Sequence, residues 1–163
     1  MVDEKKNNKW ILLYAKNSFT KFFSFCCRSA LFYFEIKIIE ETFDQICYSS
    51  FGFNNINPKL FICNHQTLME KRNKEKSHFS FSWIDEDIFG CGIVFPKIND
   101  SITLPYIFFT KNGKEILNKT SLLYGKNDTF RPFIELLSCS VKVNFGEDLD
   151  KNPFCYNFEE HKI

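Results

Sequence analysis

The sequence predicts an all-β protein in which two antiparallel sheets pack face to face as a β-sandwich. Strand-like segments recur at the spacing of about 8 to 12 residues that is typical of sandwiches. No stretch of about 10 to 12 residues has the 3.6-residue period of an amphipathic helix. Aromatic residues make up 18% of the chain, and phenylalanine alone contributes 21 residues, which favours a core of aromatic strands. A sheet that is apolar on both faces needs a second sheet to cover it, so two sheets are expected.

The clearest element is a β-hairpin that turns at Asn112-Gly113. Tyr106 to Lys111 forms its first strand, and both faces of this strand are largely apolar, so it should lie inside a sheet and not at an edge. Asn and Gly tolerate the positive φ that both central positions of a type I′ turn require. Replacing Gly113 by valine should therefore strain the backbone and collapse folding, whereas replacing Lys111 by alanine should hardly matter.

The remaining elements follow in chain order from alternating residues and turn residues. Residues 1–8 are polar and form a frayed tail, and Trp10 to Tyr14 gives a candidate first strand. Phe19 to Phe25 is interrupted by polar residues and suits an edge strand or a segment lying over the end of a sheet. Further strands are expected at Leu31–Ile39, Ile46–Phe53, Leu60–Cys63, Phe79–Trp83, Ile88–Phe95, Phe133–Leu137, Val141–Phe145 and, as a closing strand, Phe154–Phe158.

Composition and charge exclude several classes of partner. The formal net charge is +1 and the isoelectric point is about 7.5, so the chain has no overall field that would attract nucleic acid or an anionic membrane. No segment reaches the ~20 apolar residues that a membrane-spanning helix needs. Seven cysteines, an odd number without a Cys-x-x-Cys pair, favour free thiols, and we expect a cytoplasmic protein.

Neither a metal site nor a catalytic site is predicted. The four residues that could converge on zinc have no recognised ligand spacing, so we expect no metal and no cofactor. They are Cys63, His65, His78 and Cys91. No histidine accompanies a nucleophile that it could activate, and the acidic residues from Asp85 to Asp87 are explained as a turn. Gly90-Cys91-Gly92 lacks the third glycine of a nucleotide loop and continues as a strand. We therefore expect a protein that is not an enzyme.

Several blocks of the sequence follow one another in a recognisable order between about Ser24 and Phe158. The blocks are Tyr33-Phe34-Glu35-Ile36-Lys37-Ile38, Phe51-Gly52-Phe53, Asp87-Ile88-Phe89-Gly90-Cys91-Gly92-Ile93, Phe108-Phe109-Thr110-Lys111-Asn112-Gly113, Arg131-Pro132-Phe133-Ile134-Glu135-Leu136 and Val143-Asn144-Phe145-Gly146. Together they resemble the SPRY domain family of Ran-binding-protein-like proteins. The block ending at Gly113 matches that family's Phe-Thr-Lys-Asn-Gly almost letter for letter.

The resemblance implies a bent β-sandwich without catalytic apparatus, whose loops at one end bind a partner protein. It divides the chain into an N-terminal extension with the candidate first strand (1–23), a SPRY-like sandwich (24–158) and a C-terminal tail (159–163). The chain departs from the family where Arg131 replaces the usual Tyr and where residues 137–140 lack the Trp-Gly of some members. A Gly-rich stretch before the block at Asp87 is also missing. The Asn-rich peptide ligands of those members therefore do not carry over.

These observations predict a protein-protein interaction module, serving as the substrate-recognition or adaptor part of a larger assembly such as a ubiquitin ligase. Its ligand would be a protein or a peptide. The candidate loops are Asn54 to Lys59, Glu70 to His78 and Leu137 to Ser140. The candidate partner-binding residues are Tyr48, Asn54, Asn55, Ser138 and Cys139.

Two alternatives stay open. A carbohydrate-binding β-sandwich would need an exposed aromatic platform, for which Trp10 or Trp83 is the candidate. Trp83 alternates with other aromatic residues along its strand, however, which predicts burial. A secreted SPRY effector-like protein would need an export signal, and the apolar run from Trp10 to Ala15 is too short for the core of one.

Overall fold

The computed structural model describes residues 10–20, 29–39, 47–54, 56, 59–63, 78–97, 104–122 and 129–161. The first sheet has the strand order β1 (Ile11–Tyr14), β12 (Pro132–Leu137), β4 (Tyr48–Phe53), β5 (Lys59–Cys63) and β6 (His78–Ser82). The second sheet has the order β10 (Thr120–Ser121), β8 (Tyr106–Lys111), β7 (Ile88–Phe95), β3 (Ala30–Ile39) and β13 (Ser140–Asn144), and β9 (Lys114–Glu115) pairs with β8. Two short strands, β2 (Phe19–Thr20) and β11 (Thr129–Phe130), pair with each other.

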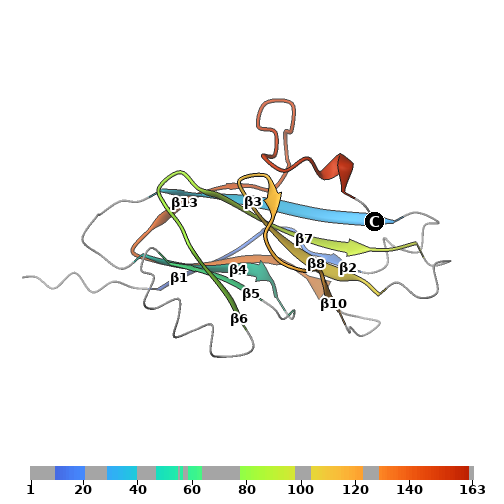
Figure 1. Cartoon of the computed structure of the whole chain (residues 1–163), viewed down its shortest axis with the longest axis horizontal. Helices are drawn as coiled ribbons and strands as arrows, with labels where there is room; N and C mark the ends of the chain where they lie inside the picture. The colour runs from blue at the N-terminus through green and yellow to red at the C-terminus, as the bar shows by residue number, and fades with distance from the viewer. Residues whose placement is uncertain are drawn as a thin grey trace, which may run out of the picture.

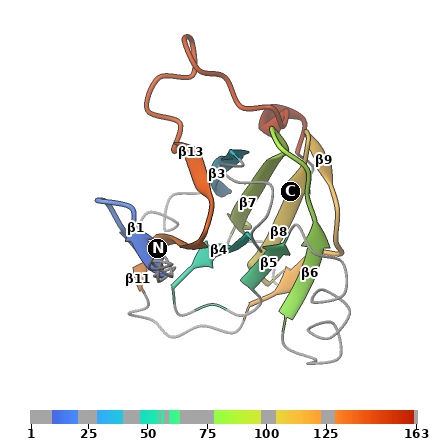
Figure 2. The ribbon, with the colours of Figure 1, turned by 90° about the vertical axis from the view of Figure 1, so that its left-hand side faces the viewer.

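The two sheets stack as the layers of a sandwich. Figure 1 shows β3, β7 and β13 above β1, β4 and β5, and Figure 2 shows β1 and β13 along the same side of the molecule. All pairs but one among the described strands are antiparallel, which confirms the predicted sandwich of antiparallel sheets. The exception is β5 with β6, which run parallel. Residues 64–77 between them are long enough for the crossover of about a dozen residues that a parallel pair requires.

Phenylalanine is the commonest of the described buried residues that form the core between the sheets. On β3, the predicted alternation directs Phe34 and Ile36 into the core, where each is at most 1% exposed. Phe51 of β4 lies among Phe34, Phe89 and Phe109, with ring centroids 6.2 to 6.3 Å apart. These edge-to-face contacts join strands of both sheets, so burial of aromatic surface stabilises the stacking.

The predicted hairpin at Asn112-Gly113 is confirmed. The φ angles of Asn112 and Gly113 are 48° and 76°, both positive as a type I′ turn requires. β8 lies between β7 and β10, and its residues before Lys111 are buried, so it is a central strand as predicted. The sequence does not reveal that Lys111 has an ion-pair partner. Its ammonium lies 2.8 Å from the buried carboxylate of Asp87, which comes within reach only because β7 pairs with β8.

The outer face of the second sheet is covered by the segment from Gly146 to His161, which we call the strap. Figure 1 shows the strap above the upper layer. The closing strand predicted at Phe154–Phe158 is wrong, because the strap contains no described strand and ends in the 3-10 helix η2 (Phe158–Glu160). Tyr156 and His161 of the strap are buried, and the His161 ring stacks on Phe108 of β8 with centroids 4.2 Å apart.

Hydrogen bonds to the side chain of Glu35 on β3, and not the pairing of two strands, hold the strap on the second sheet. The buried Glu35 carboxylate accepts hydrogen bonds from the backbone N–H groups of Cys155 and Tyr156, both at 2.9 Å. It also accepts a bond from the Tyr33 hydroxyl at 3.0 Å, and since that hydroxyl has one proton, Thr110 donates to the Tyr33 oxygen at 2.7 Å. A buried carboxylate with three donors is well satisfied, so the strap is fixed at its middle.

Two glycines of β7 make room for the side chains beneath the strap. A Cβ at Gly92 would overlap the ring of Phe108, and a Cβ at Gly90 would overlap the hydroxyl of Tyr33. The block Gly90-Cys91-Gly92 thus serves close packing within the sheet, which explains these glycines without a nucleotide.

Candidate functional site

Three of the predicted partner-binding residues lie together at one end of the sandwich. Tyr48 begins β4 and pairs with Leu137, and Ser138 and Cys139 then carry the chain across to β13 in the other sheet. The thiol of Cys139 donates to the carbonyl oxygen of Tyr48 at 3.4 Å, and the thiol of Cys47 donates to that of Ser138 at 2.8 Å. We call this the Ser138 end of the sandwich.

Burial limits what this turn can offer a partner. Tyr48 and Cys139 are buried, and the edge of the Trp10 ring packs against Tyr48 with centroids 5.3 Å apart. Ser138 is half-buried and has a φ of 58°. Tyr48 and Cys139 therefore pack on the inner side of the turn, and Ser138 is the one residue of the three that is partly exposed, although its hydroxyl oxygen is buried.

The predicted residue Asn54 lies at the opposite end of the same strand. β4 and β12 are antiparallel and pair over six residues, so Asn54 and Ser138 are separated by the length of the strand. Asn54 donates its backbone N–H to the carbonyl oxygen of Arg131 at 2.9 Å, and its side-chain oxygen accepts from the Arg131 N–H. Asn55 lies outside the described residues. The sequence leads us to expect the loop that begins at Asn54 and the loop that contains Ser138 at the same end of the sandwich. This expectation is wrong, because the register of β4 and β12 places Asn54 and Ser138 at opposite ends.

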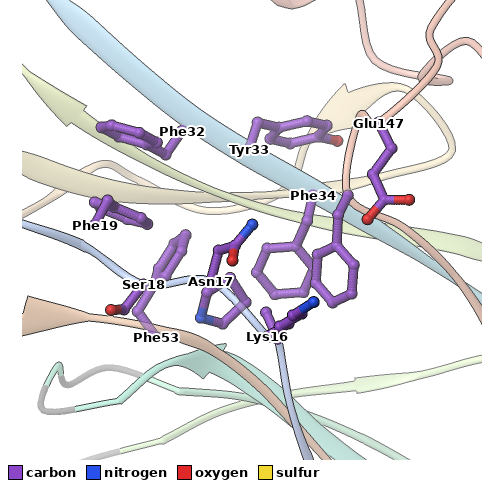
Figure 3. A pocket seen from close by; sticks show the side chains of 12 residues that line it. Lys16, Asn17, Ser18, Phe19, Phe32, Tyr33, Phe34, Phe53 and Glu147 are labelled. Atoms are coloured by element: carbon purple, nitrogen blue, oxygen red, sulfur yellow. The ribbon is translucent and has the colours of Figure 1, made fainter.

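A cavity of about 310 Å³ opens at the Asn54 end, on the side of the molecule between β1 and β13 (Figure 3). We call it the lateral pocket. Phe34 and Phe53, which belong to the core, form its floor together with Pro132. Phe19 of β2 and Phe145, which directly follows β13, form walls. Sequence reasoning missed this pocket, because its lining comes from five segments far apart in the chain.

Each wall of the lateral pocket is held by specific contacts. The N–H of Ala15 donates to the carbonyl oxygen of Pro132 at 3.0 Å, which ties the segment after β1 to β12. The Phe19 ring stacks on Phe32 with centroids 3.8 Å apart. The opposite wall, Phe145, packs 5.7 Å from Phe34 and remains 40% exposed. Contacts within the chain thus hold the walls of the pocket in place.

The rim of the lateral pocket is polar. Lys16, Asn17 and Ser18 are exposed on one side, and Glu147 is exposed on the other. Figure 3 shows the Asn17 amide in the middle of the cavity, between Phe19 and Glu147. An aromatic cavity with an amide and two opposite charges at its rim can enclose an apolar side chain and hydrogen-bond the backbone beside it. The sequence signal for this rim is the polar run Lys16-Asn17-Ser18, which lies between the apolar residues 10–15 and Phe19.

At the Ser138 end, hydrogen bonds and an ion pair hold the turn that contains Asp87. Asp87 accepts hydrogen bonds from the Ile84 N–H at 2.9 Å and the Asn112 side chain at 2.7 Å, in addition to its ion pair with Lys111. Burial raises the pKa of Asp87, but these hydrogen bonds and the Lys111 charge outweigh burial and hold the pKa below its usual range. The acidic residues 85–87 therefore form a turn, as predicted, and Ile84 stands exposed on it.

The buried histidine of the strap, His161, lies between two tyrosine hydroxyls. The His161 ring nitrogens contact the hydroxyls of Tyr156 at 2.6 Å and Tyr106 at 2.9 Å. Burial and the nearby Lys119 lower the pKa of His161, against the opposing effect of Glu115. A neutral imidazole between two phenols fits a packing role.

The described ranges contain no group of three His, Cys, Asp or Glu side chains placed to ligate a metal ion. Cys91, one of the four zinc candidates, is buried in the core, and His65 lies outside the described residues. The helical structure in the described part of the chain is too short and too polar to cross a membrane.

The two stacked sheets, the hairpin and the Gly-containing central strand define a SPRY-like β-sandwich. The fold is similar to the crystal structure of a human SPRY domain, with a TM-score of 0.51 over 87% of this chain and 88% of that chain. The two sequences are 17% identical, so this similarity concerns the fold. No protein-family model matches the chain, and no curated protein matches it in sequence. The predicted SPRY-like fold is confirmed.

Proposed function

We propose that the chain is a non-catalytic interaction module that binds an extended segment of a partner protein, with one bulky apolar side chain inserted in the lateral pocket. The observation that carries this proposal is an aromatic cavity of about 310 Å³ beneath a rim that holds Lys16, Asn17 and Glu147. Ligand sites of roughly 300 to 1,000 Å³ typically combine apolar walls with a few polar groups. This function makes the domain the recognition part of a larger assembly.

The size and rigidity of the lateral pocket support an anchor of one residue. Burying a single Leu, Met or Phe side chain contributes about 1.5–3 kcal/mol, which corresponds to roughly 10- to 150-fold in affinity. Phe34 and Phe53 already belong to the packed core, so the floor needs no ordering when the ligand binds. Phe145 and Lys16 remain accessible to the ligand's neighbouring residues.

The loops that recognise the partner in this proposal differ from the loops that the sequence favours. They are residues 15–18 and 145–147, which both reach the Asn54 end. Asn54 acts indirectly, since its two hydrogen bonds to Arg131 position the neighbouring Pro132 in the floor. Ser138 belongs to the opposite end and lies outside this site.

Carbohydrate binding has less support among the described residues. Trp83 is buried, as the sequence predicts, and cannot serve as a platform. Trp10 is exposed, but the residues that follow it on β1 are apolar and offer no side-chain hydrogen bonds except the Tyr14 hydroxyl. A sugar needs several such groups around its ring.

The test is a selection of binders from a random peptide library displayed on phage, followed by titration of a selected synthetic peptide. The enriched peptides should share one bulky apolar residue. Phe145→Ala removes an exposed wall and Lys16→Glu reverses a rim charge, and each should weaken binding about tenfold or more. The matched control is Ile84→Ala, which removes an exposed apolar side chain at the Ser138 end and should leave affinity unchanged.

A further variant distinguishes the two ends of the sandwich. Ser138→Arg should leave peptide affinity unchanged if the lateral pocket is the site. Loss of binding in Ser138→Arg, together with full binding in the two pocket variants, would move the site to the Ser138 end. Failure to enrich any peptide would contradict the proposed function itself. Thermal melting of each variant separates loss of binding from loss of fold.

A further inference from the structure

The edge strand β1 exposes an unbroken apolar surface. β1 pairs with β12 on one edge, and no other described strand pairs with its second edge. Five consecutive large apolar side chains are 43% to 55% exposed, namely Trp10, Ile11, Leu12, Leu13 and Tyr14. A long, exposed and apolar edge strand is a template on which another strand can add.

The edge strand β13 has a charged residue that opposes pairing with another strand, and β1 has none. β13 lies along the same side of the molecule and carries the exposed Lys142 at its centre (Figure 2). A lysine in that position opposes pairing with another strand, because the charge would have to lose its water. β10, an edge on the other side, is only two residues long. β1 carries no charge, proline or glycine, and it pairs residue for residue with β12 without a bulge.

We propose that the partner of β1 is a second copy of this chain, paired antiparallel so that two first sheets join edge to edge about a two-fold axis. Residues that face one another across such an axis must point to the same side of the sheet. The register that pairs all five apolar residues places Leu12 opposite Leu12 of the other copy. Ile11 then faces Leu13, and Trp10 faces Tyr14. This inference does not depend on the proposed peptide function.

Charge and area are compatible with this partner. Because β1 has no charged residue, self-pairing brings no like charges together, and the chain's net charge of +1 gives little long-range repulsion. A half-exposed aromatic side chain contributes on the order of 100 Å², and a half-exposed Ile or Leu contributes on the order of 50 Å², so the two aromatic and three aliphatic residues supply on the order of 350 Å² per copy. Standard interfaces bury about 800 Å² per partner, which places this contact among transient, concentration-dependent dimers.

Sedimentation velocity over a range of protein concentrations tests the proposal on the full chain. The wild-type protein should shift from monomer to dimer as concentration rises. Leu12→Lys places two ammonium groups opposite each other at the axis and should raise the dissociation constant about tenfold or more. Ile84→Lys introduces the same charge at another exposed apolar position and should leave the dimer intact.

Cysteine cross-linking tests the register. Directly opposed residues in antiparallel strands have Cβ atoms roughly 4.5–5.5 Å apart, whereas diagonal ones are about 7–8 Å apart. In a Cys155→Ser background, which removes an exposed thiol, Leu12→Cys should therefore oxidise to a covalent dimer and Leu13→Cys should not.

Three results would overturn the proposal. A wild-type chain that stays monomeric at all concentrations has no second copy on β1, and its apolar edge then belongs to a different protein or to another part of this chain. A dimer that Leu12→Lys leaves intact forms through another surface. Equal cross-linking at positions 12 and 13 would indicate random collision instead of the stated register.

Discussion

Replacing Glu35 by glutamine should release the strap from the second sheet. One carboxylate oxygen accepts from the Cys155 N–H, and the other accepts from the Tyr156 N–H and the Tyr33 hydroxyl. Glutamine has the same shape, but its NH₂ group must replace one of these oxygens. Whichever way the amide turns, at least one donor of the strap or of Tyr33 faces another donor.

The size of the effect follows from the number of bonds. Hydrogen bonds to a charged group contribute about 1.5–3 kcal/mol each, and bonds between neutral groups contribute about 0.5–1.5 kcal/mol. Glu35→Gln loses one bond and weakens the other bonds, so we expect a loss of about 2–4 kcal/mol. A domain of this length loses about 2–4 °C in Tm per kcal/mol, which gives a decrease of roughly 4–16 °C. The strap can also detach while the sheets remain folded, so these values are upper bounds for global unfolding.

Thermal unfolding and amide hydrogen exchange measure the two consequences. The amides of Cys155 and Tyr156 should exchange more than about tenfold faster in Glu35→Gln, since they lose their acceptor. Glu147→Gln is the matched control, because Glu147 lies exposed on the same strap. If both variants melt at the same temperature and exchange at the same rate, Glu35 is not the anchor that the geometry indicates.

The remaining predictions concern the hairpin, the strap and the thiols. Gly113→Val should cost at least about 2 kcal/mol in denaturant unfolding, because φ is 76° and a Cβ would lie 2.7 Å from the Cys155 carbonyl oxygen; a midpoint equal to wild type would contradict this. Lys111→Ala should cost about 1–2 kcal/mol by leaving the buried Asp87 without its ion pair, whereas the exposed Lys114→Ala should cost nearly nothing. Burial lowers the pKa of His161 in the folded chain, so the unfolded chain binds the proton more tightly. The free energy of unfolding should therefore decrease by up to about 1.4 kcal/mol per pH unit as the pH falls below about 6.5. That slope should vanish in His161→Gln, and an unchanged slope would assign it to another group. With a thiol reagent on the native protein, Cys155→Ser should lose one equivalent of labelling, since Cys155 is exposed; no loss would show that the strap shields it.

Local patterns in the sequence determined the strands and the fold class. The alternation along β3 predicts Phe34 and Ile36 in the core, and Asn112-Gly113 predicts a turn with two positive φ angles, because both features depend on neighbouring residues alone. The need to cover apolar sheet faces then predicts two layers. The ordered blocks that resemble the SPRY family extend the same local information to the arrangement of the sandwich, and the structural similarity agrees with them.

Tertiary structure decided which segments meet. The strand register separates Asn54 from Ser138 and turns Tyr48 inward, although the sequence offers all three as one surface. Pairing of β7 with β8 brings Asp87 to Lys111, and folding of the strap brings Cys155 to Glu35 across most of the chain's length. The lateral pocket and the unprotected edge of β1 likewise depend on strand order. These features escape the sequence because periodicity shows which face a residue occupies, whereas the register and order of strands decide which residues share that face.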